Sequence, residues 1–305
     1  MALLQGPDVV DVDTPHGMVR VRDTGGDGIP VLLVHSLLLD PDLYAGVVPL
    51  LVAHGWRCVL PELPLGGHAL PLDLDADLTP PGLAMLLVEV LDALELPQVH
   101  VVGVDTGGAL AQLLMARYRD RVGAVVLTGC DAYEHFPART WVGRLFTPLF
   151  LSGVLWAAAQ ALRLRVFRRL LLLPPITHRG ADDATLVRWT SPLRDAQVRR
   201  DVRKAFWTMD RRHTLAAAEA NRDFPRPVLI AWGDDDRLFP GSLGVRLVED
   251  LPNARLVVLP DCAAFASLDQ PDLLAAHVHD HLSTQPHLAG SAGLAPEPAA
   301  PPASL

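Results

Sequence analysis

The stretch that decides the fold is Gln98-Val99-His100-Val101-Val102-Gly103-Val104-Asp105-Thr106-Gly107-Gly108-Ala109-Leu110. Its apolar first half predicts a buried strand over residues 99–103, and a helix is expected over residues 109–119. Glycines stand two residues before and two residues after Asp105. Such small residues permit a sharp, strained turn that pushes the central side chain out of the top of a sheet. The stretch therefore predicts a nucleophile elbow with a carboxylate at its apex.

A carboxylate at the apex indicates covalent catalysis through an ester, because Asp is one of the side chains that attack an electrophilic carbon. The simpler alternative is that Asp105 only caps the following helix, since Asp is a favoured N-cap residue. The glycines on both sides of Asp105 favour the catalytic interpretation.

Strands and helices alternate on both sides of this turn. An N-terminal hairpin over residues 9–13 and 18–22 precedes the alternation. We predict further strands at residues 31–34, 57–60, 124–128, 228–232 and 255–259, and helices at residues 41–53, 79–96, 243–251 and 271–282. This order predicts an α/β fold with a doubly wound, mostly parallel sheet, in which ligands bind beyond the carboxyl ends of the strands.

Helical sequence interrupts the alternation after the strand at residues 124–128. We therefore predict a core of residues 1–132 and 222–282, a helical cap inserted at residues 133–221, and a disordered Pro/Ala-rich tail over residues 283–305. The insert carries a local charge of +8, whereas the rest of the chain carries −17. Such a basic insert could attract an anionic substrate or an acidic carrier protein, but solvated helix faces paired with acidic neighbours are the favoured interpretation.

The insert also contains an uncharged run of 18 residues, Leu145 to Leu162. This length is the lower limit for a membrane span. Because Pro148, Gly153 and Gln160 interrupt the run, a helical hairpin whose apolar side faces a substrate cavity is favoured over peripheral or integral membrane contact.

Composition narrows the class of protein. Half of the 305 residues are hydrophobic, the net charge is −9, and arginines are not interleaved with aromatic residues, so we expect no nucleic-acid partner. Cys58, Cys130 and Cys262 cannot complete a disulfide framework, and the N-terminus does not read as a secretory signal, so a cytoplasmic setting is expected. No glycine-rich phosphate loop or set of metal ligands is present, and we expect neither cofactor nor metal. The oligomeric state stays open.

The turn His35-Ser36-Leu37 follows the predicted strand at residues 31–34. Backbone N–H groups after such a strand could form an oxyanion or halide site together with the N–H of Thr106.

Taken together, the elbow, this turn and the late segments resemble the α/β-hydrolase fold superfamily, specifically its aspartate-nucleophile branch of haloalkane dehalogenases and epoxide hydrolases. The resemblance covers roughly residues 10–282. It implies a carboxylate that orients a histidine, and the Gly-x-x-Asp-x-x-x-Pro pattern from Gly233 to Pro240 puts Asp236 in that position. Asp131, just past the strand at residues 124–128, is the second candidate for the acid.

The family's Gly-His-Phe is matched here by Ala263-Ala264-Phe265, so Ala264 occupies the position of the general-base histidine. In the related mechanism the nucleophile attacks an alkyl halide or epoxide carbon without a base, but water needs one to cleave the resulting ester. An Asp-only site would therefore alkylate itself and stop. His35 and His68 are candidate replacements, although related proteins often carry structural histidines at these places.

Two further departures from the family's pattern limit the class of substrate. Dehalogenases of this type usually hold the halide with an indole after the nucleophile and an Asn or Glu in the first turn, where this chain has Thr106 and Ser36-Leu37. Epoxide hydrolases open the ring with cap tyrosines, and the insert offers only Tyr133. The leading hypothesis is a hydrolase-like enzyme that acts on a lipophilic small molecule through Asp105. The alternative is a non-hydrolytic descendant, either a ligand-binding or accessory protein or a lyase or cyclase, that uses the same cavity.

Overall fold

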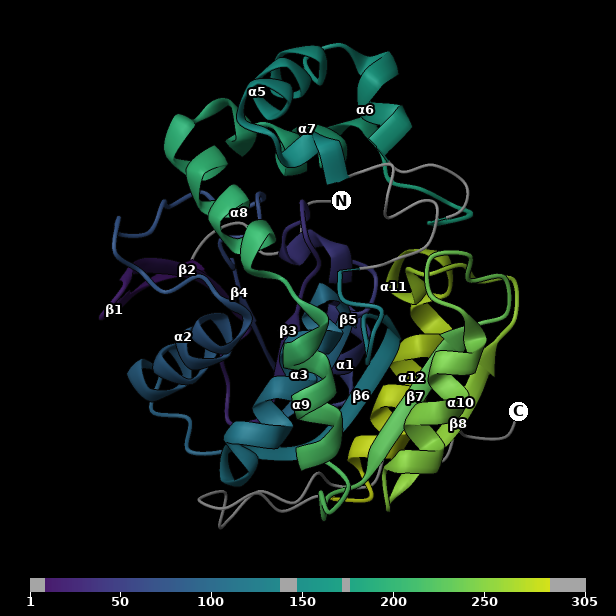
Figure 1. Ribbon diagram of the computed structural model, residues 1–305. Helices are drawn as coiled ribbons and strands as arrows, with labels where there is room; N and C mark the ends of the chain where they lie inside the picture. Colours follow the sequence, from purple (N-terminus) through teal and green to yellow (C-terminus); the bar gives the residue numbers. More distant parts are fainter. Residues whose placement is uncertain (1–8, 138–146, 172–175, 286–305) are drawn as a thin grey trace, which may run out of the picture.

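One sheet runs through the molecule (Figure 1). The structure is a computed structural model that describes residues 9–137, 147–171 and 176–285. Within these residues eight strands are hydrogen-bonded in the order β1-β2-β4-β3-β5-β6-β7-β8, and only β2 runs antiparallel to its two neighbours. Their bounds are β1 Val9–Thr14, β2 Gly17–Asp23, β3 Pro30–Val34, β4 Arg57–Pro61, β5 Val99–Asp105, β6 Val122–Cys130, β7 Val228–Gly233 and β8 Ala254–Leu259. The predicted mostly parallel α/β sheet is confirmed.

Helices cover both faces of the sheet because successive side chains of each strand point to opposite sides. Val101 and Val102 of β5, for example, belong to separate buried clusters on the two faces. The cluster on one face includes residues of α2, α3 and α10, and the cluster on the other includes residues of α1 and α12 (Figure 1). These helices span α1 Val48–Ala53, α2 Pro80–Ala93, α3 Thr106–Arg117, α10 Gly241–Asp250 and α12 Pro271–Leu282.

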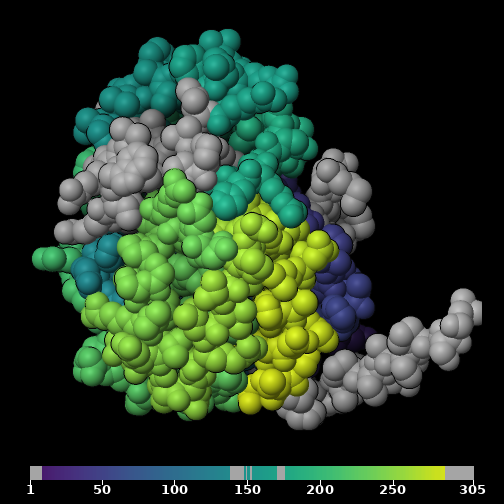
Figure 2. All heavy atoms as spheres, turned by 90° about the vertical axis from the view of Figure 1, so that its right-hand side faces the viewer, coloured from purple at the N-terminus to yellow at the C-terminus, as the bar shows by residue number. Residues whose placement is uncertain are grey.

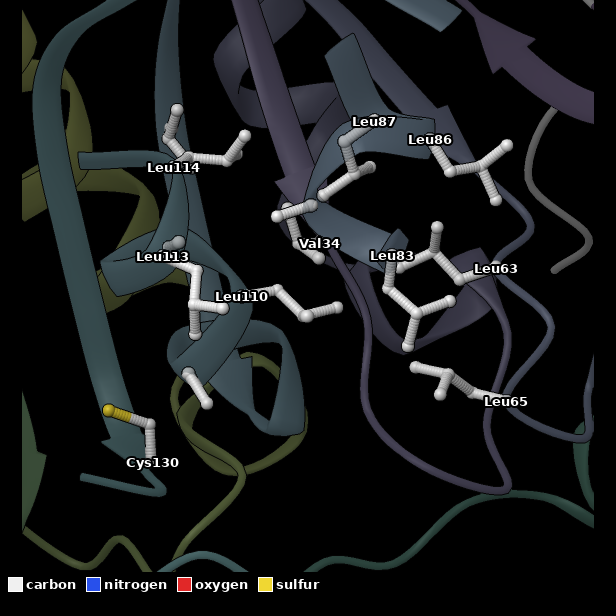
Figure 3. Close-up of a cluster of buried hydrophobic side chains, with 14 of the residues drawn as sticks. Val34, Leu63, Leu65, Leu83, Leu86, Leu87, Leu110, Leu113, Leu114 and Cys130 are labelled. Atoms are coloured by element: carbon white, nitrogen blue, oxygen red, sulfur yellow. The ribbon is translucent and has the colours of Figure 1, made fainter. Parts of the chain in front are cut away.

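Leucines fix α2 and α3 against the centre of the sheet. Figure 3 shows Leu83 and Leu87 of α2 on one side and Leu110 of α3 on the other, with Val34 of β3 between them. All four side chains are fully buried or nearly so. Deleting a buried leucine side chain of this kind costs about 2–5 kcal/mol. This packing holds the start of α3, and therefore the elbow, in a fixed position.

Two predicted helices differ from those observed. The helix expected at residues 41–53 is a 3-10 turn, Pro41–Tyr44, followed by α1, because Asp40 caps the first turn through the backbone N–H of Asp42 (2.7 Å). The helix expected at residues 109–119 begins at Thr106 and ends at Arg117. Glycines 107 and 108 were assigned to the turn, but they form the first turn of the helix.

The segment between β6 and β7 forms helices α5 Ser152–Ala161, α6 Arg165–Leu171, α7 Asp183–Thr190, α8 Ala196–Thr208 and α9 Arg211–Ala220. In Figures 1 and 2 the helices α5 to α8 lie at the upper end of the molecule. Trp189 of this segment donates to Asp40 after β3 (2.8 Å), and Asp201 accepts from Leu72 after β4 (3.0 Å). These contacts place α7 and α8 beyond the carboxyl ends of the strands. In contrast, α9 packs against α3 beside the sheet.

Within the described residues, no helix has the length and apolar character needed to cross a membrane. The uncharged run of residues 145–162 contributes α5, which has only 10 residues. The predicted tail falls mostly outside the described residues, but residues 283–285 still hydrogen-bond to the end of α12. Cys58, Cys130 and Cys262 are free and buried.

Candidate active site

The elbow is a direct passage from β5 to α3. Asp105 is the last residue of the strand and Thr106 the first residue of the helix. Asp105 has φ 52° and ψ −124°, a conformation of the kind that costs about 1–3 kcal/mol in a non-glycine residue. Within the described chain its side chain makes no capping hydrogen bond to α3. The strained backbone, together with the lack of a cap hydrogen bond, favours a functional role for Asp105 over helix capping.

The glycines around Asp105 allow close approach of three elements. A Cβ on Gly103 would lie 2.6 Å from the carbonyl oxygen of Gly107, and a Cβ on Gly107 would overlap the carbonyl of Val34. A Cβ on Gly108 would overlap the side chain of Cys130. None of the three glycines has a positive φ, so the left-handed conformation belongs to Asp105 alone. The glycines instead let α3 lie directly on β3 and β6.

Ser36 and Thr106 hold the carboxyl group of Asp105. The hydroxyl of Ser36 donates to Oδ2 of Asp105, and the backbone N–H of Thr106 also stabilises the charged carboxylate. Burial opposes both effects and raises the pKa of Asp105 to about 6. Asp105 is still partly exposed, so a small molecule can reach it. At neutral pH the carboxylate is mainly ionised, which nucleophilic attack requires.

Asp131 lies next to Asp105 at the end of β6. Its backbone N–H donates to the carbonyl oxygen of Asp105 (3.3 Å), and its side chain is 2% exposed. Burial raises the pKa of Asp131 well above the usual range, the nearby Asp105 carboxylate raises it further, and the hydroxyl of Thr106 opposes both. Oδ1 of Asp131 has no hydrogen-bond partner among the described residues. Asp131 is therefore protonated when Asp105 carries the charge.

Asp236 and Ala264 lie together on the other side of β6. A Cβ on Gly129 would be 2.6 Å from Oδ2 of Asp236 and 3.3 Å from Cα of Ala264. Oδ1 of Asp236 accepts the backbone N–H groups of Leu238 (2.9 Å) and Phe239 (2.8 Å). Its Oδ2 is buried and has no hydrogen-bond partner within the described chain. This oxygen is where an acid of a triad would hold a histidine, and the neighbouring side chain is only a methyl group.

Burial also raises the pKa of Asp236 to about 7, and the charge on Asp105 adds to the effect. No arginine or lysine of the described chain forms an ion pair with Asp105, Asp131 or Asp236. We call these three residues the carboxyl cluster. Because like charges this close cannot all ionise, the cluster retains protons at neutral pH.

His35 and His68 are both fully engaged in hydrogen bonds. Nδ1 of His35 donates to the adjacent carbonyl oxygen (2.9 Å) and Nε2 accepts the N–H of Leu63 (2.9 Å), while burial lowers the pKa of His35 to about 4. Nδ1 of His68 accepts the N–H of Gly66 (3.2 Å), and Nε2 lies 3.4 Å from Asp201. Neither ring has a nitrogen free to accept a proton from water, so both are structural.

Leu37 and Tyr133 complete the predicted set. Within the described residues the N–H of Leu37 has no hydrogen-bond acceptor, so it is available as an oxyanion donor beside Ser36. Tyr133 is buried, and its hydroxyl donates to Asp250 of α10 (2.8 Å) beneath the guanidinium of Arg246. Tyr133 is therefore committed to α10 and is not placed to open an epoxide.

Sequence reasoning missed the part played by Asp269. Its Oδ1 accepts from the hydroxyl of Thr177 (2.6 Å) and from the backbone N–H groups of His178 and Arg179 (2.9 Å each), and its Oδ2 accepts from the N–H of Ala263 (3.0 Å). This buried carboxylate joins the inserted segment to the loop that carries Ala264. The available signal was an Asp after the last strand, two residues before the proline that begins α12.

These elements match a known family over most of the chain. A profile described as alpha/beta hydrolase fold matches residues 29–271. The chain belongs to this family. The chain is 26% identical over 237 residues to a 2-hydroxy-6-oxo-6-phenylhexa-2,4-dienoate hydrolase of Burkholderia cepacia, which covers 72% of this chain and 75% of the relative. It is 24% identical over 282 residues to a 2-hydroxy-6-oxononadienedioate/2-hydroxy-6-oxononatrienedioate hydrolase of Cupriavidus pinatubonensis, with 90% and 93% covered.

Solved structures with the same fold include haloalkane dehalogenases. This alpha/beta hydrolase superposes on one from Bradyrhizobium elkani with a TM-score of 0.75 at 19% identity, covering 90% of this chain and 97% of the other. An ancestral haloalkane dehalogenase gives a TM-score of 0.74 at 22% identity, with 90% and 98% covered. At these identities the similarity establishes the fold alone.

Proposed function

We propose that this alpha/beta hydrolase acts on a neutral, lipophilic small molecule, and that Asp105 attacks an electrophilic carbon of the substrate as its nucleophile. The observation that carries the proposal is the strained, partly exposed Asp105, whose carboxylate is held by Ser36 and Thr106. Strain and fixed hydrogen bonds preorganise the attacking oxygen and lower the reorganisation needed for the reaction. Asp236 supports the site as the second carboxylate. We also propose a cytoplasmic location.

The charge around Asp105 favours a neutral substrate. The relatives named above are, by their names, hydrolases of dienoates and dienedioates, which are anions. Arg22, whose side chain is 12% exposed, is already occupied by Asp40, Asp42 and Glu62. An anion placed beside the carboxyl cluster would meet repulsion, and no arginine or lysine of the described residues pairs with the cluster to offset it. A haloalkane or an epoxide brings no negative charge.

The first step follows from the geometry. A carboxylate oxygen of Asp105 forms a bond to the substrate carbon, and the carbon–halogen bond breaks so that the halide leaves with its electron pair. With an epoxide the carbon–oxygen bond breaks instead, and the alkoxide takes a proton. A protonated carboxyl of Asp131 or Asp236 would supply that proton, since Tyr133 is engaged elsewhere. Both reactions leave an ester on Asp105.

The second step, attack of water on the ester, needs a base. Ala264 provides none, and His35 and His68 have no free ring nitrogen. We therefore propose that the ester accumulates and that turnover is slow.

A non-hydrolytic reaction is the second candidate. It is favoured by the unpartnered oxygens Oδ1 of Asp131 and Oδ2 of Asp236, because burial raises the pKa of both carboxyls and so favours the protonated forms that can donate to a substrate. A lyase or cyclase would use such acids together with Asp105 as base, without an ester. A ligand-binding protein would use the cavity without any reaction.

Rapid-quench measurement of product release separates these candidates. The panel consists of alkyl halides, epoxides and activated esters. We expect a burst in which each chain releases one leaving group or consumes one substrate molecule. A much slower phase should follow, limited by hydrolysis of the ester on Asp105. Asp105→Asn removes the nucleophile and should abolish the burst. Steady release without a burst would indicate another base, and a rearranged product formed without any burst would favour the lyase or cyclase. If every compound in the panel stays unchanged, the nucleophile hypothesis is wrong for these substrate classes.

A further inference from the structure

Helix α5 is apolar on all sides, yet it is covered on only one. It contains no charged residue, and an apolar helix of this kind is normally buried in protein or lipid. Leu155, Ala159 and Leu162 lie on one face at helical spacing and are buried in the molecule. Val154 (44% exposed) and Trp156 (55% exposed) lie on the uncovered side. The sequence favoured a cavity-lining role for this run, but these side chains face outward.

The start of α6 also exposes large apolar side chains. Leu164, Val166 and Phe167 are 59%, 61% and 44% exposed, and Leu151, before α5, is 50% exposed. Single exposed apolar residues are ordinary on protein surfaces, but several large ones on two adjacent short helices form a patch that marks an interaction site. Figures 1 and 2 show α5 and α6 at the end of the molecule farthest from β8 and α12. We define the apolar face as Leu151, Val154, Trp156, Leu164, Val166 and Phe167.

The charge beside the apolar face is mainly positive. Residues 147–171 contain four arginines and no aspartate or glutamate. Arg168 is buried and forms a two-oxygen contact with Asp183, at 3.0 Å to each oxygen. Arg163 and Arg169 are exposed, and within the described chain they form no ion pair. Asp183 thus pairs with Arg165 and Arg168, whereas, among the described residues, Arg163 and Arg169 leave unpaired positive charge beside the apolar face.

We propose that the apolar face is a docking surface for an anionic lipid bilayer. Large apolar and aromatic side chains bordered by arginines are the combination that places helices in the interface of a membrane, with the apolar residues at the acyl boundary and the cations at the headgroups. The helices are too short to cross a bilayer, so they lie on it. The docked surface belongs to the inserted segment, which lies beyond the carboxyl ends of the strands.

A bilayer fits this surface better than a second copy of the chain does. Two identical faces that meet around a two-fold axis would bring Arg163 and Arg169 of one copy toward those of the other, and neither arginine has a carboxylate partner within the described chain. An anionic bilayer supplies both an apolar layer and complementary negative charge.

Flotation of the full chain with lipid vesicles tests the proposal. We expect the protein to float with vesicles that contain phosphatidylglycerol, to bind weakly to pure phosphatidylcholine, and to lose binding as the salt concentration rises. Phe167→Ser should weaken binding about tenfold because it removes one buried aromatic group. Arg163→Gln and Arg169→Gln should each weaken it about fivefold, the loss expected for one cation at an anionic surface. Circular dichroism and thermal unfolding confirm that each variant is folded.

Matched controls come from equally exposed apolar residues elsewhere. Leu74 (77% exposed) and Val258 (57% exposed) lie outside the inserted segment, and Leu74→Ser and Val258→Ser should leave binding unchanged. Two results would overturn the proposal. One is the absence of binding to phosphatidylglycerol vesicles. The other is self-association that Phe167→Ser abolishes, seen by sedimentation without vesicle binding, which would assign the face to a second copy of the chain.

Discussion

At the residue scale, Asp105 combines a strained backbone with a carboxylate that burial makes a weaker acid. Its neighbours Ser36 and Thr106 could be predicted from the sequence, because both stand at the carboxyl ends of strands that the apolar pattern identifies. The protonation of Asp131 and Asp236 could not be predicted. Strand order places their backbones near Asp105, but only the packed side chains show that no cation lies between them.

The rate at which Asp105 is alkylated should depend on pH. The pKa of Asp105 is raised to about 6, and only the ionised carboxylate attacks carbon. We therefore expect the rate of ester formation to rise about tenfold per pH unit below pH 6 and to level off above it. The check is the burst rate of halide release from pH 5 to pH 8. A rate that is flat across this range would exclude Asp105 as the titrating nucleophile.

A histidine at position 264 should restore turnover. Oδ2 of Asp236 is buried, unpartnered within the described chain and close to Ala264, so the imidazole of Ala264→His would have an acceptor for its N–H. We expect the burst to be followed by steady hydrolysis at least about 100-fold faster than in the unsubstituted chain, the usual contribution of a positioned base.

The matched control is Ala264→Asn, which adds a polar side chain of similar size but no base. This variant should form the ester on Asp105 but should hydrolyse it no faster than the unsubstituted chain does. Equal steady-state rates for the histidine and asparagine variants, measured with a substrate that gives a burst, would count against a missing base as the cause of slow turnover.

At the element scale, close contacts between segments that are distant in sequence set the position of the site. The apolar periodicity predicted α12 to the residue, since its buried face follows the 3.6-residue repeat. The start of α3 was predicted three residues late, because the glycines that usually mark a turn serve here for close packing inside the helix. The contacts between α9 and α3 could not be predicted either, because a helical sequence pattern does not reveal which element the helix packs against.

Asp269 should be a main link between the inserted segment and the core. Asp269→Ala would remove the acceptor of four hydrogen bonds that are buried or partly buried. We expect a loss of roughly 3 kcal/mol or more in the free energy of unfolding. Urea unfolding followed by circular dichroism gives the value. The control Asp272→Ala removes an exposed carboxylate of α12 and should change the stability by less than about 0.5 kcal/mol. Equal losses for the two variants would refute the role of Asp269.

At the scale of the whole molecule, the carboxyl cluster lowers the stability of the fold while it supplies the reactive groups of the site. Buried carboxyls whose folded-state pKa is raised bind protons in the folded state at pH values where the unfolded chain has released them. Stability therefore falls as pH rises from about 4 to about 7 through this contribution, and the full penalty is present above pH 7.

Asp236→Asn should relieve this penalty without disturbing the hydrogen bonds from Leu238 and Phe239, because the amide oxygen can replace Oδ1. The pKa of Asp236 is about 7 against an ordinary value of 3.8, so at pH 8 the variant should be more stable by on the order of 3 kcal/mol. Below pH 4 the two proteins should unfold alike. Thermal unfolding at pH 4 and pH 8 checks this, and a variant less stable at pH 8 would contradict a buried, unpaired charge.

The central claim is that Asp105 forms an ester that the site cannot hydrolyse. Intact-protein mass spectrometry after incubation with alkyl halides and epoxides, followed by peptide mapping, tests it most directly. We predict one adduct per chain, located on the peptide that contains Asp105, persistent on dilution and absent in Asp105→Asn. An adduct on another residue, or product formed by the natural chain while Asp105 stays unmodified at every time point, would contradict the account.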